Sequence, residues 1–139
     1  MKIKRLLAMV LAVCMGLALT VSVAGTTLHD SAFGTYNGAA IDSYLDVYVS
    51  TSSATGYIDG YIWSGTLPKI ETRWDAADYL TGAALGGDSK TAWNSNKAFD
   101  STMSFGFNSS NGFRVWGAAH FYTSVNGTPY TLRTSVIYT

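Results

Sequence analysis

Cysteine, proline and charge are all scarce in this chain of 139 residues. The only cysteine is Cys14, and proline occurs twice, at Pro68 and Pro129. Without a second cysteine the chain can form neither an internal disulfide nor a cysteine-based zinc site. Charged residues make up 13% of the chain and balance to a formal net charge of zero. We therefore expect no nucleic-acid partner, because phosphate binding needs a basic patch.

Residues that carry catalytic or metal chemistry are also few. His29 and His120 are the only histidines, and the signatures of phosphate loops, zinc sites and serine nucleophile elbows do not occur. His29 lies in a stretch that we expect to be flexible. Asp75, Asp78 and Asp88 lack the dense alternation of a calcium loop and are interpreted as turn residues. We predict no enzymatic activity, no cofactor and no metal site.

The N-terminus has the pattern of a secretory signal peptide. Three basic residues precede the charge-free stretch from Leu6 to Val23, and Ser22-Val23-Ala24 offers a small-x-small cleavage site before Gly25. Two alternatives are a retained membrane anchor, since eighteen residues nearly span a bilayer, and a lipid on Cys14. We predict a signal peptide over 1–24 and one secreted, extracellular domain over 25–139 that does not span a membrane.

Cleavage after Ala24 changes the composition of the chain. It removes three of the nine basic residues and leaves six against nine acidic ones, a formal charge of −3. The mature domain has neither a thiol nor a disulfide, so packing and sheet hydrogen bonds must supply its stability. Its length is sufficient for one hydrophobic core.

Two segments alternate between apolar and polar residues with the period of a β-strand. In residues 41–50, one side carries Ile41, Leu45, Val47 and Val49, and the other carries Asp42, Tyr44, Asp46 and Tyr48. In residues 56–64, Ile58 and Ile62 oppose Tyr57, Asp59, Tyr61 and Trp63. The turn over 51–55 joins them into a predicted hairpin.

Residues 65–97 have a mixed pattern. Ile70, Thr72 and Trp74 alternate like a strand, although Pro68 followed by Ile70 and Trp74 also fits the first turns of a helix. We favour a short strand that ends at Trp74, followed by a loop through Gly86 and Gly87.

The last third predicts three strands. The first has an apolar face of Phe99, Ser101, Met103, Phe105 and Phe107. A turn over 108–112 leads to a strand from Phe113 to Val125, and Asn126-Gly127 then favours a two-residue type I′ hairpin into residues 128–138. Consecutive strands joined in this way form an antiparallel meander.

Together these elements define the expected fold class. A hairpin, at least one further strand and a meander present apolar faces that must cover each other. We predict an all-β domain, a small antiparallel β-sandwich or a closed barrel of about 6–8 strands, with a C-terminal three-stranded meander.

The C-terminal pattern resembles that of a known group of proteins. Ala119-His120-Phe121-Tyr122, Asn126-Gly127 and the run from Thr131 to Tyr138 look like the final hairpin of small exported β proteins of Gram-positive bacteria. More distantly, the signal peptide and the Tyr-, Ser- and Gly-rich domain are similar to lactococcin-type bacteriocins. The resemblance implies an antimicrobial role outside the cell.

The polar side of the predicted hairpin is the candidate binding surface. Aromatic rings beside carboxylates suit sugars, because a ring packs on C–H groups while a carboxylate accepts hydrogen bonds from hydroxyls, and they also suit protein partners. The candidate residues are Tyr44, Tyr48, Tyr57, Tyr61, Trp63, Asp46 and Asp59. The alternative is that the rings only stabilise the sheet through cross-strand pairs.

The function predicted from these features is that of a non-enzymatic extracellular binding protein. Its partner would be a cell-envelope component, a polysaccharide or a protein, and its sharpest form is a bacteriocin-like action on a cell envelope. A carbohydrate- or cell-wall-binding module and a self-assembling surface protein are the alternatives.

A second polar feature follows from the predicted registers. A two-residue turn at Asn126-Gly127 would place His120 opposite Arg133, and the turn over 108–112 would place Asp100 opposite His120. Asp100, His120 and Arg133 would then form one row across three strands. Without a nucleophile beside it, we interpret this row as a structural charge ladder.

Overall fold

The computed structural model describes residues 25–139, so the predicted signal peptide lies outside the described residues. The described chain is all-β and contains no helix that is long and apolar enough to cross a membrane. It forms eight strands: β1 (Thr26–Tyr36), β2 (Ala39–Val49), β3 (Ser53–Ile62), β4 (Leu67–Asp78), β5 (Ala84–Ser95), β6 (Lys97–Gly106), β7 (Phe113–Tyr122) and β8 (Tyr130–Tyr138).

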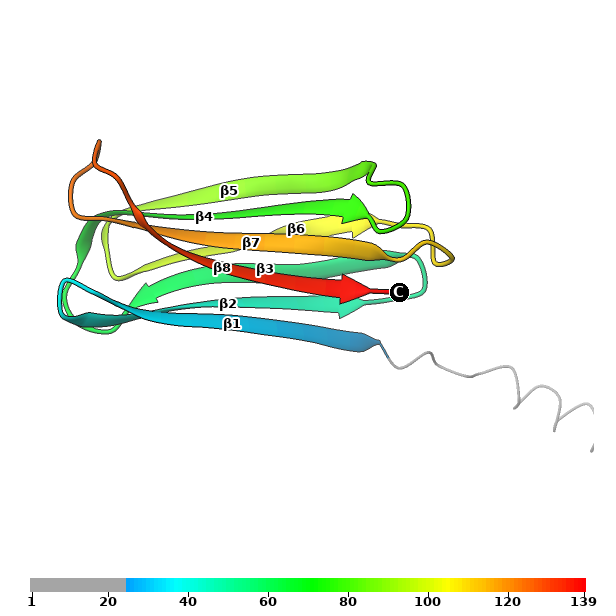
Figure 1. Cartoon of the computed structure of the whole chain (residues 1–139), viewed down its shortest axis with the longest axis horizontal. Coiled ribbons are helices and arrows are strands. Elements are labelled where there is room, and N and C mark those ends of the chain that lie inside the picture. The colour runs from blue at the N-terminus through cyan, green and yellow to red at the C-terminus, as the bar shows by residue number, and fades with distance from the viewer. Residues whose placement is uncertain (1–24) are drawn as a thin grey trace, which may run out of the picture.

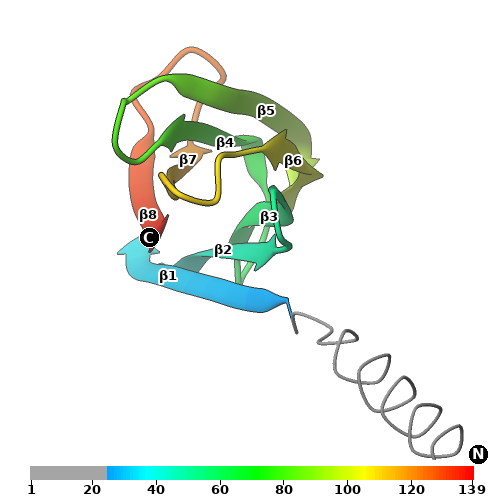
Figure 2. The same ribbon diagram turned by 90° about the vertical axis from the view of Figure 1, so that its right-hand side faces the viewer.

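The strands form two four-stranded antiparallel sheets that pack face to face (Figure 1). Sheet A has the order β1-β2-β3-β6, and sheet B has the order β5-β4-β7-β8. Viewed end-on, the edges approach each other, β1 beside β8 and β5 beside β6 (Figure 2). The backbone N–H of Ser135 donates to Oδ2 of Asp30 at 2.7 Å between β8 and β1. No ladder joins these edges within residues 25–139, so the fold is a sandwich, one of the two predicted forms.

The predicted first hairpin is confirmed as β2 and β3. Its register pairs Val49 with Ala54 and Ile41 with Ile62. The predicted apolar side is buried: Leu45, Val47 and Ile58 have no exposed surface. Period-two alternation was therefore sufficient to assign the inner and outer faces of this hairpin.

The segment before this hairpin is a strand, which corrects our expectation that it is flexible. β1 pairs with β2 along its whole length, from Thr26 opposite Val49 to Tyr36 opposite Ala39. Asn37 and Gly38 form the two-residue connection, with φ of 50° and 78°. Positive φ at both central residues is the requirement of a type I′ turn, which Asn-Gly satisfies at low cost.

Residues 65–97 contain two long strands, so the predicted loop through Gly86 and Gly87 is wrong. Both glycines lie within β5, opposite Ala76 and Asp75 of β4. A Cβ on Gly86 would lie 3.1 Å from the ring of Trp74. Gly86 therefore leaves room for the Trp74 ring inside a strand, whereas two consecutive glycines in the sequence predict a loop.

The three-stranded C-terminal meander is also wrong, although β7 and β8 do pair. β6 pairs with β3 in sheet A, while β7 pairs with β4 and β8 in sheet B. The turn over 108–112 therefore crosses between the sheets. A crossing turn brings two apolar faces together across the core: the rings of Phe107 and Phe113 meet edge to face at 4.8 Å. The hydrophobic pattern is the same for a hairpin and for this arch.

A bulge in β6 changes which of its residues face the core. Gly56 and Ile58 of β3 are two residues apart, whereas their partners Met103 and Asp100 are three apart, so β6 has one extra residue. Phe99 consequently points outward and is 43% exposed, while Asp100 points inward and is 2% exposed. The predicted apolar face is correct from Met103 onward and reversed before it.

The connection between β7 and β8 is longer than the two residues predicted. The N–H of Gly127 donates to the carbonyl of Ser124 at 3.0 Å, so Val125 and Asn126 are the central residues of the turn. The register then pairs His120 with Thr131 and Ala118 with Arg133. Asn126-Gly127 has the sequence of a type I′ turn without its conformation, since neither residue has positive φ.

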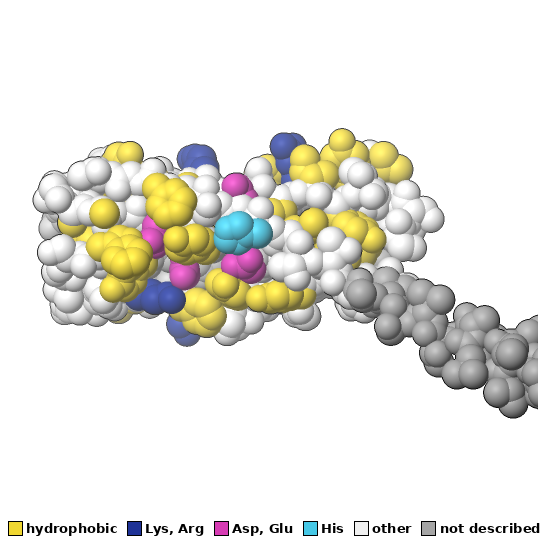
Figure 3. Space-filling view, turned by 90° about the horizontal axis from the view of Figure 1, so that it is seen from below, with side chains coloured by type: hydrophobic (Ala, Val, Ile, Leu, Met, Phe, Trp, Pro, Cys, Tyr) yellow, Lys and Arg dark blue, Asp and Glu magenta, His cyan; other side chains and the backbone are white. Residues whose placement is uncertain are grey.

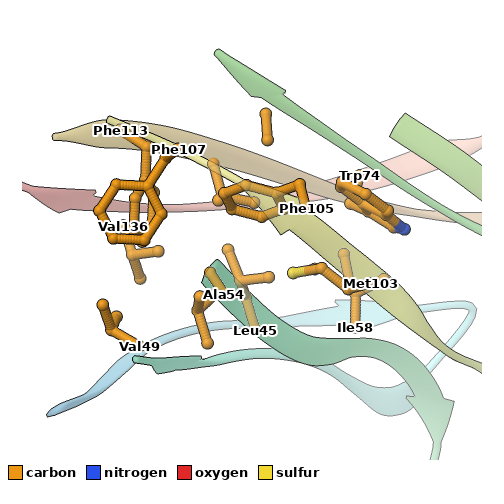
Figure 4. Packing of buried hydrophobic residues seen from close by; sticks show 13 residues of the cluster. Leu45, Val49, Ala54, Ile58, Trp74, Met103, Phe105, Phe107, Phe113 and Val136 are labelled. Atoms are coloured by element: carbon orange, nitrogen blue, oxygen red, sulfur yellow. The ribbon is translucent and has the colours of Figure 1, made fainter. Parts of the chain in front are cut away.

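The interior contains two hydrophobic clusters along the length of the sandwich. The larger is rich in aromatic residues, with Trp74 and Phe113 of sheet B facing Leu45, Val49 and Ile58 of sheet A across the interior (Figure 4). The smaller includes Ile41, Ile70 and Phe121. Both sheets contribute to each cluster, so burial of apolar area across the sandwich holds the two outer faces rigid.

Candidate functional site

The outer face of sheet A carries all the residues predicted to bind. The alternation of β2 and β3 turns Leu45 and Ile58 inward and their neighbours outward. On the side where β1 and β2 lie, hydrophobic side chains surround a short group of acidic side chains and a histidine (Figure 3). We call this surface the aromatic face; it consists of His29, Phe33, Asp42, Tyr44, Asp46, Tyr48, Tyr57, Asp59, Tyr61, Trp63, Lys97 and Phe99.

One end of the aromatic face presents a tryptophan in a fixed position. Trp63 follows β3 and is 64% exposed, yet its indole Nε1 donates to Oδ2 of Asp42 at 2.7 Å. The ring of Tyr61 meets it edge to face, with centroids 5.2 Å apart. A large ring that is both exposed and held from two sides loses little side-chain entropy on binding.

Asp42 itself is not available to a ligand. It alternates outward, as predicted, but is only 1% exposed. Burial raises the pKa of its carboxyl above the ordinary value. Its role is to orient Trp63.

The middle of the aromatic face combines a histidine, a carboxylate and two rings. Nδ1 of His29 lies 2.7 Å from Oδ1 of Asp46, and the ring of Tyr44 contacts both His29 and Phe33, at 5.9 and 5.8 Å between centroids. Hydrogen bonding to the Asp46 carboxylate raises the pKa of Tyr57 to about 12. The raised pKa places the Tyr57 hydroxyl next to the Asp46 carboxylate in the middle of this face.

Asp59 makes structural contacts within sheet A, so it is removed from the set of predicted ligand-binding residues. It is 7% exposed, and its Oδ1 accepts from the backbone N–H of Tyr44 at 3.0 Å. Oδ2 lies 3.2 Å from Nζ of Lys97, and its carbonyl accepts from the Ser43 hydroxyl at 2.6 Å. The contacts to Ser43 and Tyr44 take the place of ladder bonds between the pairs Asp42–Tyr61 and Leu45–Ile58.

Sequence reasoning missed the parts of the aromatic face that lie on β1 and β6. Phe33 is 65% exposed, and Phe99 contacts Tyr57 with centroids 5.3 Å apart. Asn37-Gly38 between two alternating runs was the signal that could have identified β1. The bulge that turns Phe99 outward has no comparable signal in the sequence.

The predicted row of Asp100, His120 and Arg133 does not exist. Asp100 lies in sheet A opposite Ile58 and faces the core. His120 lies between Glu71 of β4 and Thr131 of β8, with its Nδ1 2.8 Å from the Thr131 hydroxyl. Both errors have a physical cause, the arch before β7 and the longer turn after it.

No three His, Cys, Asp or Glu side chains lie together as a metal site in the part of the chain that the structure describes. No protein-family model matches the chain, and no curated protein is detectably similar to it in sequence. The geometry of the two outer faces is therefore the guide to function.

Proposed function

We propose that the protein is a non-enzymatic extracellular binding protein and that the aromatic face binds a saccharide of a cell envelope. The observation that carries the proposal is Trp63, a ring that is exposed by 64% while Asp42 and Tyr61 hold it in place. Aromatic rings pack on the apolar C–H face of a sugar, and neighbouring polar groups fix its orientation.

The distribution of rings favours an extended chain over a single sugar. Trp63 lies beyond the pair Asp42–Tyr61, whereas Tyr48 pairs with Thr55 at the other end of the hairpin. Tyr48 lies six positions after Asp42 on β2, a span of about 20 Å at the rise of a β-strand. Phe33, Tyr44 and Tyr57 lie between these ends, and Asp46 supplies the carboxylate beside them.

Co-sedimentation with isolated peptidoglycan sacculi and with a neutral cell-wall polysaccharide tests the proposal. The double variant Trp63→Ala, Tyr48→Ala should lose most of the bound fraction and keep a cooperative unfolding transition, because neither ring fills the core. Trp93→Ala is the matched control, since Trp93 is equally large and 56% exposed but lies on β5 of sheet B. Unchanged binding by the double variant, or an equal loss in the control, would refute the proposal.

A growth assay separates binding alone from the bacteriocin-like form of this function. Purified protein added to growing Gram-positive cells should stop growth only if envelope binding is followed by damage. Light scattering of the same sample distinguishes the third alternative, because a self-assembling surface protein forms large particles at the concentrations used.

A further inference from the structure

The outer face of sheet B carries a groove that the aromatic face does not explain. It has a volume of about 310 Å³, and we call it the arginine groove; its lining residues are Arg73, Asp75, Trp116, Gly117, Ala118, His120 and Arg133. It lies on the opposite side of the sandwich from Trp63.

The strand registers explain why the surface is hollow here. Ala118 of β7 lies between Arg73 of β4 and Arg133 of β8 in one cross-strand row. Along β7, its neighbours on the same face are Trp116 and His120. A methyl group surrounded by four large side chains forms the floor of a pocket, because directly opposed Cβ atoms lie only about 5 Å apart.

The charges around this floor leave one guanidinium without a partner. Arg73 is held by Asp75, with Nε and Nη2 donating to its two carboxylate oxygens at 2.9 and 3.1 Å. Within residues 25–139, Arg133 has no carboxylate oxygen within 4.0 Å. Burial lowers the pKa of His120 most; Glu71 opposes this shift, and Arg133, Lys69 and Arg73 add to it. A ligand anion would supply the charge that Arg133 lacks.

We propose that the arginine groove binds the carboxylate of an acidic, uronate-type sugar. The planar guanidinium of Arg133 matches the two oxygens of a carboxylate. Trp116 is 42% exposed, and the Arg114 guanidinium lies over its ring, 5.3 Å from the centroid. The pyranose would pack on the opposite face of this ring. A dianionic phosphate fits less well, because Asp75 lines the same groove and Arg133 is the one lining cation that no carboxylate of the described chain pairs.

Calorimetric titration of the purified protein with an oligogalacturonate and with its methyl ester tests this site. The two probes share ring and linkage and differ only in the carboxylate, so the acid should bind and the ester should not. Arg133→Gln should weaken binding of the acid by about tenfold or more, as expected for a charge-assisted contact. Arg133→Lys should recover only part of the loss, since it restores the charge without the fork.

Lys90→Gln is the matched control. It removes the same single charge from sheet B but lies opposite Thr72 on the edge strand β5, outside the groove lining, and should leave binding unchanged. An equal loss in Lys90→Gln and Arg133→Gln would indicate general charge attraction and overturn the proposal. So would equal binding of the methyl ester, absence of binding to the acid, or displacement of the acid by inorganic phosphate at the same concentration.

The proposal for the arginine groove can be tested separately from the proposal for the aromatic face. Trp63→Ala should leave oligogalacturonate binding intact, and Arg133→Gln should leave binding to neutral polysaccharide intact. As a second readout, the acid should raise the pH at which His120 titrates, measured by NMR, whereas the ester should not. If the acid leaves the titration of His120 unchanged, the ligand carboxylate does not lie beside Arg133, and the proposal is overturned.

Discussion

The two outer faces of the sandwich use charged residues in different ways. On sheet A, the carboxylates of Asp42 and Asp59 are buried and hold an indole and a backbone N–H. On sheet B, ion pairs form between neighbours on one strand, Lys69 with Glu71 and Arg73 with Asp75. The two buried carboxylates of sheet A are therefore part of the fold, whereas the ion pairs of sheet B join partly exposed side chains on one strand and contribute little to stability.

The largest expected difference between the faces is the effect on stability of removing one carboxylate. Asp59→Ala leaves the Tyr44 N–H without its acceptor and Lys97 without its partner, and should lower the free energy of unfolding by about 1–3 kcal/mol. Asp75→Ala breaks an exposed pair on sheet B and should cost less than about 1 kcal/mol. Urea denaturation of the two variants measures the contrast.

Asp59→Asn serves as the control for this comparison. It keeps an oxygen that can accept from Tyr44 and removes the charge that faces Lys97, so it should retain part of the lost stability. Equal destabilisation by Asp59→Ala and Asp75→Ala would mean that the buried carboxylate has no special structural role.

What the sequence could predict depends on whether a pattern has one structural solution. The alternation in residues 41–50 and 56–64 has one, because a slip of a single residue would expose Leu45 and Ile58. It therefore gave the hairpin correctly, and with it the part of the aromatic face that lies on β2 and β3. The run from Phe99 to Phe113 has two solutions, a hairpin within one sheet and an arch between sheets, and local sequence does not distinguish them.

The arginine groove was beyond sequence reasoning for a related reason. It requires that Arg73 and Arg133, sixty residues apart in the chain, lie on either side of Ala118. That row depends on the pairing of β4 with β7, which no local pattern specifies. It also depends on the length of the β7–β8 turn, where Asn126-Gly127 favoured a tighter connection than the chain adopts.

A second, smaller contrast concerns the dependence of stability on pH, which His120 of sheet B should produce in the acidic range. Burial lowers the pKa of His120 on sheet B below its ordinary value, while Glu71 opposes this effect and Arg133 adds to it. As pH falls below about 6.5, the unfolded chain therefore takes up a proton before the folded chain does. The contribution of His120 to stability is complete above that pH and is lost as pH falls toward the lower folded pKa.

The variant His120→Gln removes this titration and keeps a polar group near Thr131. Between pH 7.5 and pH 5, the wild-type protein should lose more free energy of unfolding than the variant, measured by denaturation at each pH. Parallel pH profiles for the two proteins would show that His120 titrates equally in the folded and unfolded states.

The smallest expected effect is the loss of a single hydrogen bond on the aromatic face, between Tyr57 and Asp46. The Asp46 carboxylate raises the pKa of Tyr57 to about 12 from an ordinary value of 10.0, so Tyr57 should ionise last among the accessible tyrosines in a titration followed by tyrosinate absorbance. Because its folded pKa is raised, the stabilising contribution is present below about pH 10 and is lost above it. Asp46→Asn should shift this late transition toward lower pH, and Tyr57→Phe should abolish it, with little change in stability at pH 7.

The same Asp46 carboxylate lies 2.7 Å from Nδ1 of His29, so His29→Gln tests whether the two partners compete for it. If Tyr57 keeps its late transition in Asp46→Asn, burial rather than the carboxylate raises its pKa.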